Sequence, residues 1–126
     1  MTGGAWNEYR LFLVFAPSAS DEQYTEQERL LSGHEAGFEE RDLLLVRLLE
    51  DGTGAADGEP VSAEAAENAR REYSVEDGRF AAALAGKDGG VKFRTEEPVP
   101  AREVFGRVDV MPMRRREMRE SGGGRG

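Results

Sequence analysis

Four polar residues in the C-terminal half of the chain have side chains that could form a catalytic or small-ligand site. Lys87 and Asp88 lie in a glycine-rich turn, and Asp109 and Arg114 lie on either side of a proline. Carboxylates can transfer protons, and Lys and Arg can bind small anions. Asp88 more readily shapes a turn, however, and Asp109 more readily precedes or caps a helix. A cysteine-free enzyme or small-anion-binding protein that uses these residues is therefore the alternative interpretation.

The segment around Pro112 is a candidate protein-binding surface. Pro112 fits the first turn of a short helix, and arginines would cover most sides of that helix. Methionines of the same segment would add adaptable apolar contacts. The residues of this surface are Met111, Met113, Met118, Arg114, Arg115, Arg116 and Arg119. The opposing interpretation is that the methionines pack under a sheet and the arginines pair with acids of the same chain, which is the commoner arrangement.

The chain contains no cysteine, which excludes several kinds of site. A disulfide, a thiolate nucleophile, a zinc–sulfur site and an iron–sulfur cluster all require this residue. His34 is the one imidazole, and it is followed by Glu35, Glu39 and Glu40 without the H-E-x-x-H pattern of a zinc site. The sequence therefore predicts a solvated turn around His34 and neither a metal nor another cofactor.

The stretch "LFLVFAPSASDEQY" contains a second candidate site for nucleophilic chemistry, where an apolar run breaks at Pro17. Ser20 and Gln23 have the spacing of a helix capping box. The serines have no imidazole nearby in sequence, because His34 lies beyond the end of the expected helix. We therefore expect Ser20 to begin a helix rather than to attack a substrate.

Charge divides the chain into an acidic body and a basic end. The formal net charge is −8, but residues 1–101 carry 10 basic and 21 acidic side chains, whereas residues 102–126 carry 7 and 4. An acidic body repels nucleic acid, because binding there depends on neutralising phosphates. We therefore expect no nucleic-acid partner. The same asymmetry permits a homo-oligomer in which the basic end of one copy meets the acidic body of another.

The composition predicts a soluble protein without a membrane span. Charged residues make up 33% of the chain, and no apolar run approaches the length of about 18 residues that a spanning helix needs. The first ten residues, "MTGGAWNEYR", lack the basic start and apolar region of a signal peptide. A chain from which such a peptide had been removed would look the same, so the sequence leaves the compartment open.

Hydrophobic patterning predicts an α/β protein. Residues 11–15 and 43–49 are apolar runs of the kind that form strands buried on both faces, and the helix expected between them makes a βαβ unit. Residues 50–60 are rich in Gly and Asp and are expected to form a mobile loop, and Ser62 is expected to begin a second helix. Residues 80–85 and 91–94 flank Asp88-Gly89 as two strands of a hairpin.

The expected third helix begins near Ala101, where apolar residues recur at helical spacing after Pro98 and Pro100. The resulting order, β-α-β-α-β-β-α, is that of a thioredoxin-like domain with a mixed four-stranded sheet flanked by helices. A chain of this length suits one domain, which we place at residues 1–120. Residues 121–126, "SGGGRG", are expected to be a disordered tail.

Three segments resemble a known family. They are Trp6 with "RLFLVFAP", "LAGKDGGVKFR", and "VDVMPMRRREM". They are similar to the small peroxiredoxin-like domain of unknown function that occurs alone in bacteria and, in related copies, in secreted vertebrate sushi-repeat and Equarin-type matrix proteins. The resemblance covers residues 6–119. It implies a thioredoxin-like sheet and often an exported protein, but no enzymatic activity that could be transferred.

The resemblance also implies which position in this chain corresponds to the reactive cysteine of related redox proteins, namely the break at Pro17. In redox-active members of the wider superfamily, this position holds a reactive cysteine at a helix N-terminus, where the helix dipole stabilises a thiolate. Here it reads Pro17, Ser18, Ala19, Ser20 and Asp21, and a serine cannot form the sulfenic acid of such reactions. Cysteine-dependent redox chemistry is excluded. The sequence thus favours a noncatalytic protein-binding or structural module.

Overall fold

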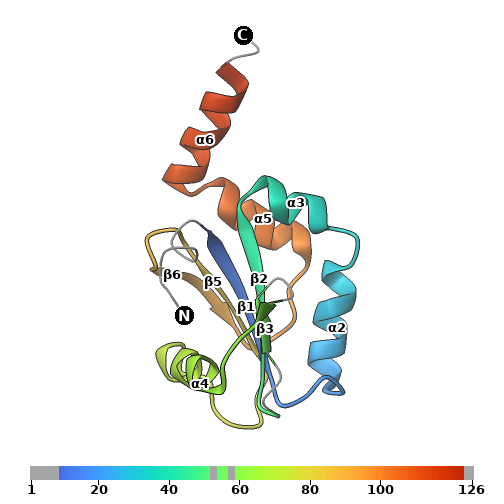
Figure 1. Cartoon of the computed structure of the whole chain (residues 1–126). Helices are drawn as coiled ribbons and strands as arrows, with labels where there is room; N and C mark the ends of the chain where they lie inside the picture. Colours follow the sequence, from blue (N-terminus) through green and yellow to red (C-terminus); the bar gives the residue numbers. More distant parts are fainter. Residues whose placement is uncertain (1–8, 52–53, 57–58, 124–126) are drawn as a thin grey trace.

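The computed structural model of the chain describes residues 9–51, 54–56 and 59–123, which form a mixed sheet with helices on both faces (Figure 1). The described strands are β1 (Arg10–Ala16), β2 (Leu43–Leu49), β3 (Gly54–Ala56), β4 (Glu59–Pro60), β5 (Ala81–Ala85) and β6 (Val91–Thr95). The described helices are α2 (Glu22–Leu31), α3 (Glu35–Glu40), α4 (Ala63–Glu72), α5 (Ala101–Asp109) and α6 (Pro112–Gly123).

The six strands form one sheet in the order β4-β3-β2-β1-β5-β6. Strands β1 and β2 are parallel, and the other neighbours are antiparallel. The predicted α/β class and mixed sheet are confirmed, but the expected four strands become six. The expectation of a loop at residues 50–60 was wrong for residues 54–56, which pair with the outer side of β2, and for Glu59–Pro60, which pairs with them in turn.

Strand β1 is the centre of the fold, and its residues are buried on alternate faces of the sheet. Phe12 and Val14 pack with side chains of α2, α3 and α5. Leu13 and Phe15 point to the other face, which is covered by Ala66 of α4 and by Tyr73, the C-cap of that helix. Because helices cover both faces, the strand reads as a continuous apolar run rather than an alternating one.

The start of α2 differs from the capping box expected at Ser20. Asp21 is the N-cap, and its carboxylate accepts a hydrogen bond of 3.0 Å from the backbone N–H of Tyr24. The hydroxyl of Ser20 lies 2.9 Å from that of Ser18, and Gln23 donates to the carbonyl of Glu96. The N-cap is therefore Asp21 and not Ser20, because a carboxylate both caps the helix and interacts favourably with its dipole.

The sequence predicted a solvated turn around His34. In the structure His34 is the N-cap of the short helix α3. Phe38 of this helix is buried in the core, and the ring of His34 lies edge-on to Phe105 with the ring centroids 6.0 Å apart. The contact of α3 with α5 is close. A Cβ atom at Gly37 would lie 2.6 Å from the ring of Phe105, so only glycine fits between these two helices.

The second half of the chain follows the sequence prediction more closely. Ser62 caps α4 by accepting a hydrogen bond from the backbone N–H of Ala65. Strands β5 and β6 form the expected hairpin, with Gly89 at a φ of 84° in the turn. Pro112 begins α6, as the fixed φ of proline at a first helical turn favours.

The C-terminal boundary remains a prediction. Helix α6 continues to Gly123, which overlaps the expected tail at residues 121–123. Residues 124–126 of that tail lie outside the described residues. None of the helices described here combines the length and apolar character needed to cross a membrane.

The close contact at Gly37 predicts opposite effects for two glycine substitutions. Gly37→Ala should lower the free energy of unfolding by about 1 kcal/mol, because overpacking costs about 1–3 kcal/mol and exceeds the gain of about 1 kcal/mol in helix propensity. Gly106→Ala, in α5 with no neighbour within 4 Å of its added Cβ, should raise it by about 0.5–1 kcal/mol. Urea unfolding measures both, and equal stabilisation by the two variants would contradict the contact.

Candidate functional site

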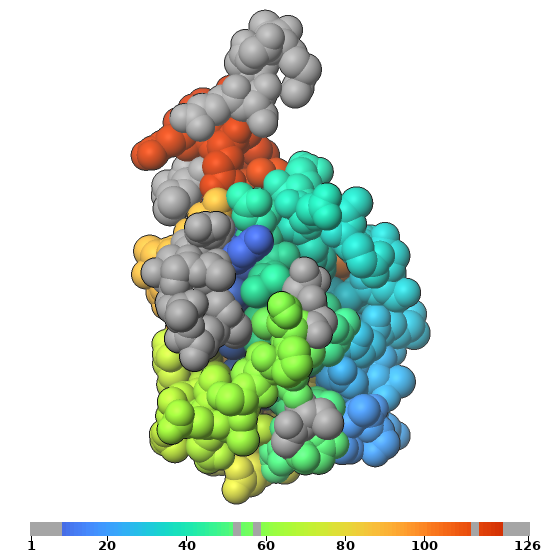
Figure 2. All heavy atoms as spheres, viewed as in Figure 1, coloured from blue at the N-terminus to red at the C-terminus, as the bar shows by residue number. Residues whose placement is uncertain are grey.

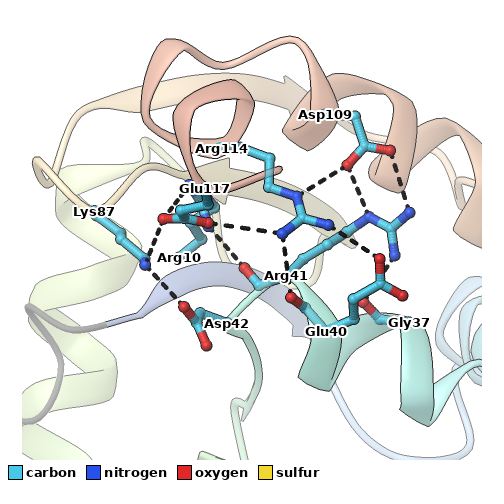
Figure 3. A network of polar contacts seen from close by, with 9 residues as sticks. All are labelled: Arg10, Gly37, Glu40, Arg41, Asp42, Lys87, Asp109, Arg114 and Glu117. Carbon is cyan, nitrogen blue, oxygen red and sulfur yellow. Dashed lines mark hydrogen bonds and ion pairs between the residues drawn. The ribbon is translucent and has the colours of Figure 1, made fainter. Parts of the chain in front are cut away.

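Three of the candidate residues, Lys87, Asp109 and Arg114, meet in a polar network at the end of the sheet where β1 and β2 begin (Figure 3). Segments far apart in the sequence contribute to it: the first residue of β1, the end of α3, the turn after β5, the end of α5 and the first turns of α6. We call this network the α6 anchor. Its charged residues are Arg10, Glu40, Arg41, Asp42, Lys87, Asp109, Arg114 and Glu117.

Arg10 is the innermost residue of the α6 anchor, with a side chain only 1% exposed. Its two terminal nitrogens donate to the two carboxylate oxygens of Glu117 at 3.2 and 3.1 Å, and one of them also donates to the carbonyl of Arg41 at 2.8 Å. This parallel arrangement is the strong geometry for a guanidinium and a carboxylate. Glu117 thereby joins α6 to the start of the central strand.

Lys87 completes the surroundings of Glu117. Its Nζ lies 2.8 Å from Oε2 of Glu117 and 2.9 Å from Oδ2 of Asp42. Burial alone would lower the pKa of Lys87, but its hydrogen bonds to Glu117 and Asp42 outweigh burial and raise it. The side chain therefore stays charged at neutral pH and serves as a second cation for Glu117.

Arg114 and Arg41 meet at the other side of the α6 anchor, where they share Asp109. Arg41 donates to both carboxylate oxygens of Asp109 at 3.0 and 3.1 Å, and Arg114 donates to one of them at 3.3 Å. Arg114 also donates to the carbonyl and carboxylate of Glu40 at 3.2 and 3.1 Å. The guanidinium of Arg41 stacks on the ring of Phe105, 4.2 Å from its centroid.

The charges of the α6 anchor balance. It contains four cations and four carboxylates, and each cation has a nitrogen within 3.1 Å of a carboxylate oxygen. An anionic ligand would have to displace one of these carboxylates and leave it without its partner. The ion pairs of the α6 anchor therefore serve to fix the position of α6 on the rest of the domain.

The structure thus brings together three of the four residues proposed for a small-ligand site, namely Lys87, Asp109 and Arg114. Asp88 is separate from them. Its carboxylate accepts from the backbone N–H of Gly90 at 2.9 Å and pairs with Lys92 at 3.0 Å. These two contacts, the backbone one first, lower the pKa of Asp88. Asp88 shapes the hairpin turn.

The proposed protein-binding residues divide into an inner and an outer set. Arg114 is buried in the α6 anchor, and Met111 is partly buried against the core. Arg115, Arg116 and Arg119 are exposed and form no ion pair with any residue in the described part of the chain. The side chain of Met113 lies outside what the structure describes, whereas Met118 is 37% exposed.

Sequence reasoning missed most of the α6 anchor. Arg10, Glu40, Arg41, Asp42 and Glu117 did not enter the candidate set. One signal was present, because Arg10 directly precedes a run expected to be buried on both faces, and a buried guanidinium needs a carboxylate partner. That partner is 107 residues away, and no local pattern identifies it.

The opposite end of β1 carries no convergent reactive group. The hydroxyls of Ser18 and Ser20 bond to each other, and Asp21 is occupied by the cap of α2. In the part of the chain that the structure describes, no three His, Asp or Glu side chains are grouped as metal ligands would be. A helix cap thus occupies the position at which the resemblance would place a reactive cysteine.

The α6 anchor predicts a large stability difference between two glutamate substitutions. Glu117→Gln should lower the free energy of unfolding by about 1–3 kcal/mol, because it leaves the charge of buried Arg10 without a carboxylate. Glu103→Gln removes an ion pair to Arg107 in which both side chains are 44% exposed, and should cost no more than about 0.5 kcal/mol. Equal effects in urea unfolding would show that the buried pair contributes no more than a surface pair.

The same carboxyl predicts a pH dependence of stability. Burial acts to raise the pKa of Glu117, but hydrogen bonds from Lys87 and Arg10 outweigh it and hold the pKa below the ordinary value of 4.5. The ionised group therefore stabilises the fold above about pH 4.5, and this contribution disappears as the pH falls through the lowered pKa. The stability difference between wild type and Glu117→Gln should shrink from pH 6 to pH 3, and a constant difference would contradict this assignment.

Structural comparison identifies the fold. The chain is similar to the reduced 2-Cys peroxiredoxin of Plasmodium vivax, with a TM-score of 0.63 at 13% identity over 87% of this chain and 81% of the other. It is also similar to Prx1a of Plasmodium yoelii, with a TM-score of 0.62 at 14% identity over 86% and 76% of the two chains. The predicted thioredoxin-like fold is confirmed, and at these identities the likeness extends to the fold alone.

Sequence comparison identifies the family. The chain is 26% identical over 116 residues to the sushi repeat-containing protein SRPX2 of Xenopus laevis, a match that covers 90% of this chain. It spans about a quarter of the length of that relative. A model of the family described as a domain of unknown function, DUF4174, matches residues 5–117, nearly the whole chain. The chain therefore belongs to this DUF4174 family, and this member has a thioredoxin-like fold and a sequence that contains no cysteine.

Proposed function

We propose that this domain is a noncatalytic protein-binding module and that the outer side of α6 is its contact surface. The contact residues are Arg115, Arg116, Arg119 and Met118, and the partner is an acidic protein surface. The observation that carries the proposal is the division of α6 into an anchored inner side and an unpaired basic outer side. A helix held by four buried or partly buried ion pairs presents its outer residues at fixed positions, which reduces the entropy lost on binding.

The shape of the molecule supports this assignment. Helix α6 extends away from the sheet and its covering helices (Figure 1), and its described atoms project above the body in the space-filling view (Figure 2). Arginine is enriched at protein interfaces because its planar group forms several hydrogen bonds at once. A projecting helix with several exposed arginines and one half-exposed methionine thus offers both charge and apolar contact.

The balanced charges of the α6 anchor support a noncatalytic role. A catalytic or anion-binding centre needs a group that is left free to meet its substrate. Lys87, Asp109 and Arg114 instead pair with partners within the chain, and Asp88 pairs with Gly90 and Lys92 of its own hairpin. The alternative of a cysteine-free enzyme at these residues therefore has less support than the binding surface.

The same proposal includes the domain boundaries, the export of the protein and its self-association. We place one domain at residues 1–120 with a glycine-rich tail at 121–126, and we propose that the protein is exported, on the strength of its similarity to a sushi repeat-containing protein. A second copy of the chain is one acidic partner that fits, because the body carries a large excess of carboxylates. Self-association would then be electrostatic and weakened by salt.

Charge reversal on α6 tests the contact surface. Fluorescence anisotropy with a labelled polyglutamate peptide should show salt-sensitive binding to the wild type and loss of binding on Arg115→Glu, Arg116→Glu and Arg119→Glu together. The matched control reverses three exposed arginines of the body, Arg71, Arg79 and Arg102, with the same change in net charge. If both triple variants lose binding equally, total charge rather than α6 is responsible, and the surface is assigned wrongly.

A ligand panel distinguishes this role from a small-molecule site. Phosphates, nucleotides, sugars and carboxylates should leave the melting temperature unchanged at two salt concentrations. A small compound at a hundred times its dissociation constant stabilises a protein by about 2.7 kcal/mol, which raises the melting temperature of a domain of this size by several degrees. A salt-resistant shift of that size would overturn the noncatalytic binding role.

A further inference from the structure

The sheet has an unprotected edge at the first half of β2. Strand β3 pairs only with Val46, Arg47 and Leu48, so residues 43–45 have no strand beside their outer edge in the described part of the chain. Those three residues are all leucines, and Leu44 and Leu45 are only partly buried although they point to opposite faces of the sheet. An apolar strand edge of this kind is a template for pairing with another chain.

The other edges of the sheet are guarded, which makes this one exceptional. The side chains of Lys92 and Arg94 in strand β6 are exposed. The pairing of β6 with β5 is also interrupted by a register shift between Leu84 and Ala85. Strand β4 is two residues long and ends in Pro60. Edge charges, bulges, short strands and proline are the devices by which proteins prevent unwanted strand pairing. Residues 43–45 carry none of these devices.

A groove runs beside the open edge and has an acidic rim. It has a volume of about 850 Å³ and lies between β2 and the helices α2 and α3. Leu43, Leu45 and Phe38 contribute its apolar wall, and Glu35 and Glu39 of α3 line it as well. Both glutamates are exposed and pair with no cation among the residues that the structure describes.

The cations of the groove are already engaged. Arg47 pairs with Glu28 at 2.6 Å, and Arg29 pairs with Glu26 on the same helix. Asp42, also in the lining, is held by Lys87 of the α6 anchor. Of the charged residues that line the groove, Glu35 and Glu39 are the two without a charged partner among the described residues. The groove therefore has an unbalanced negative charge.

We propose that residues 43–45 of β2 bind an extended basic segment of another protein by strand addition. The segment hydrogen-bonds to the free edge of β2, its apolar side chains lie against the leucines and Phe38, and its Lys or Arg side chains face Glu35 and Glu39. In strand addition the backbone supplies affinity and alternate side chains supply specificity. This surface is separate from the outer side of α6, so the inference stands or falls independently of the proposed function.

A synthetic peptide of about six residues, the usual strand length, in which lysine and valine alternate, tests the proposal on the full chain. Fluorescence anisotropy should show that it binds the wild type and that Glu35→Gln with Glu39→Gln weakens binding by about two- to thirtyfold, the range for two exposed charge pairs. The matched control, Glu64→Gln with Glu67→Gln on α4, changes the net charge equally and should leave binding unchanged. Equal weakening by both variants would overturn the assignment of the rim.

Two further measurements separate strand addition from simple charge attraction. The same peptide methylated on every backbone nitrogen keeps its charges but cannot donate backbone hydrogen bonds, and it should not bind. The unmodified peptide should slow hydrogen exchange at the backbone amides of residues 43–45. Binding of the methylated peptide with unchanged affinity, no binding of the unmodified peptide, or equal binding of a glutamate–valine peptide would each overturn the proposal.

Discussion

The buried ion pair between Arg10 and Glu117 is the constraint on which the position of the C-terminal helix α6 depends. Arg10 begins the central strand, and its side chain is almost completely removed from water. A guanidinium in that position requires a carboxylate, since an unpaired buried charge is strongly destabilising. Glu117 supplies it from the last helix, so the requirement of one strand residue decides where α6 lies.

This constraint also determines which side of α6 faces outward. Arg114 and Glu117 are one helical turn apart and both point into the α6 anchor. The positions between and after them, Arg115, Arg116 and Arg119, consequently lie on the exposed side. A run of arginines that looks uniform in the sequence thus contains one structural residue and three that are free to meet a partner.

The two ends of β1 have different roles in this protein. At its C-terminal end, Asp21 caps α2 and the nearby serines bond to each other. At its N-terminal end, Arg10 organises the α6 anchor. Both proposed contact surfaces lie near this second end, because α6 is anchored there through Arg10 and the parallel strand β2 begins beside it.

Local sequence patterns determined the apolar strands β1 and β2, the hairpin, and the helix starts at Ser62 and Pro112, because each depends on residues only a few positions apart. They missed α3, which is stabilised by Phe38 and the contact of Gly37 with Phe105, and they missed β3 and β4, which exist because β2 offers a free edge. Only the tertiary structure decided the α6 anchor, because the partners of Arg10, Arg41 and Arg114 come from distant segments whose proximity results from the packing of the sheet and its helices.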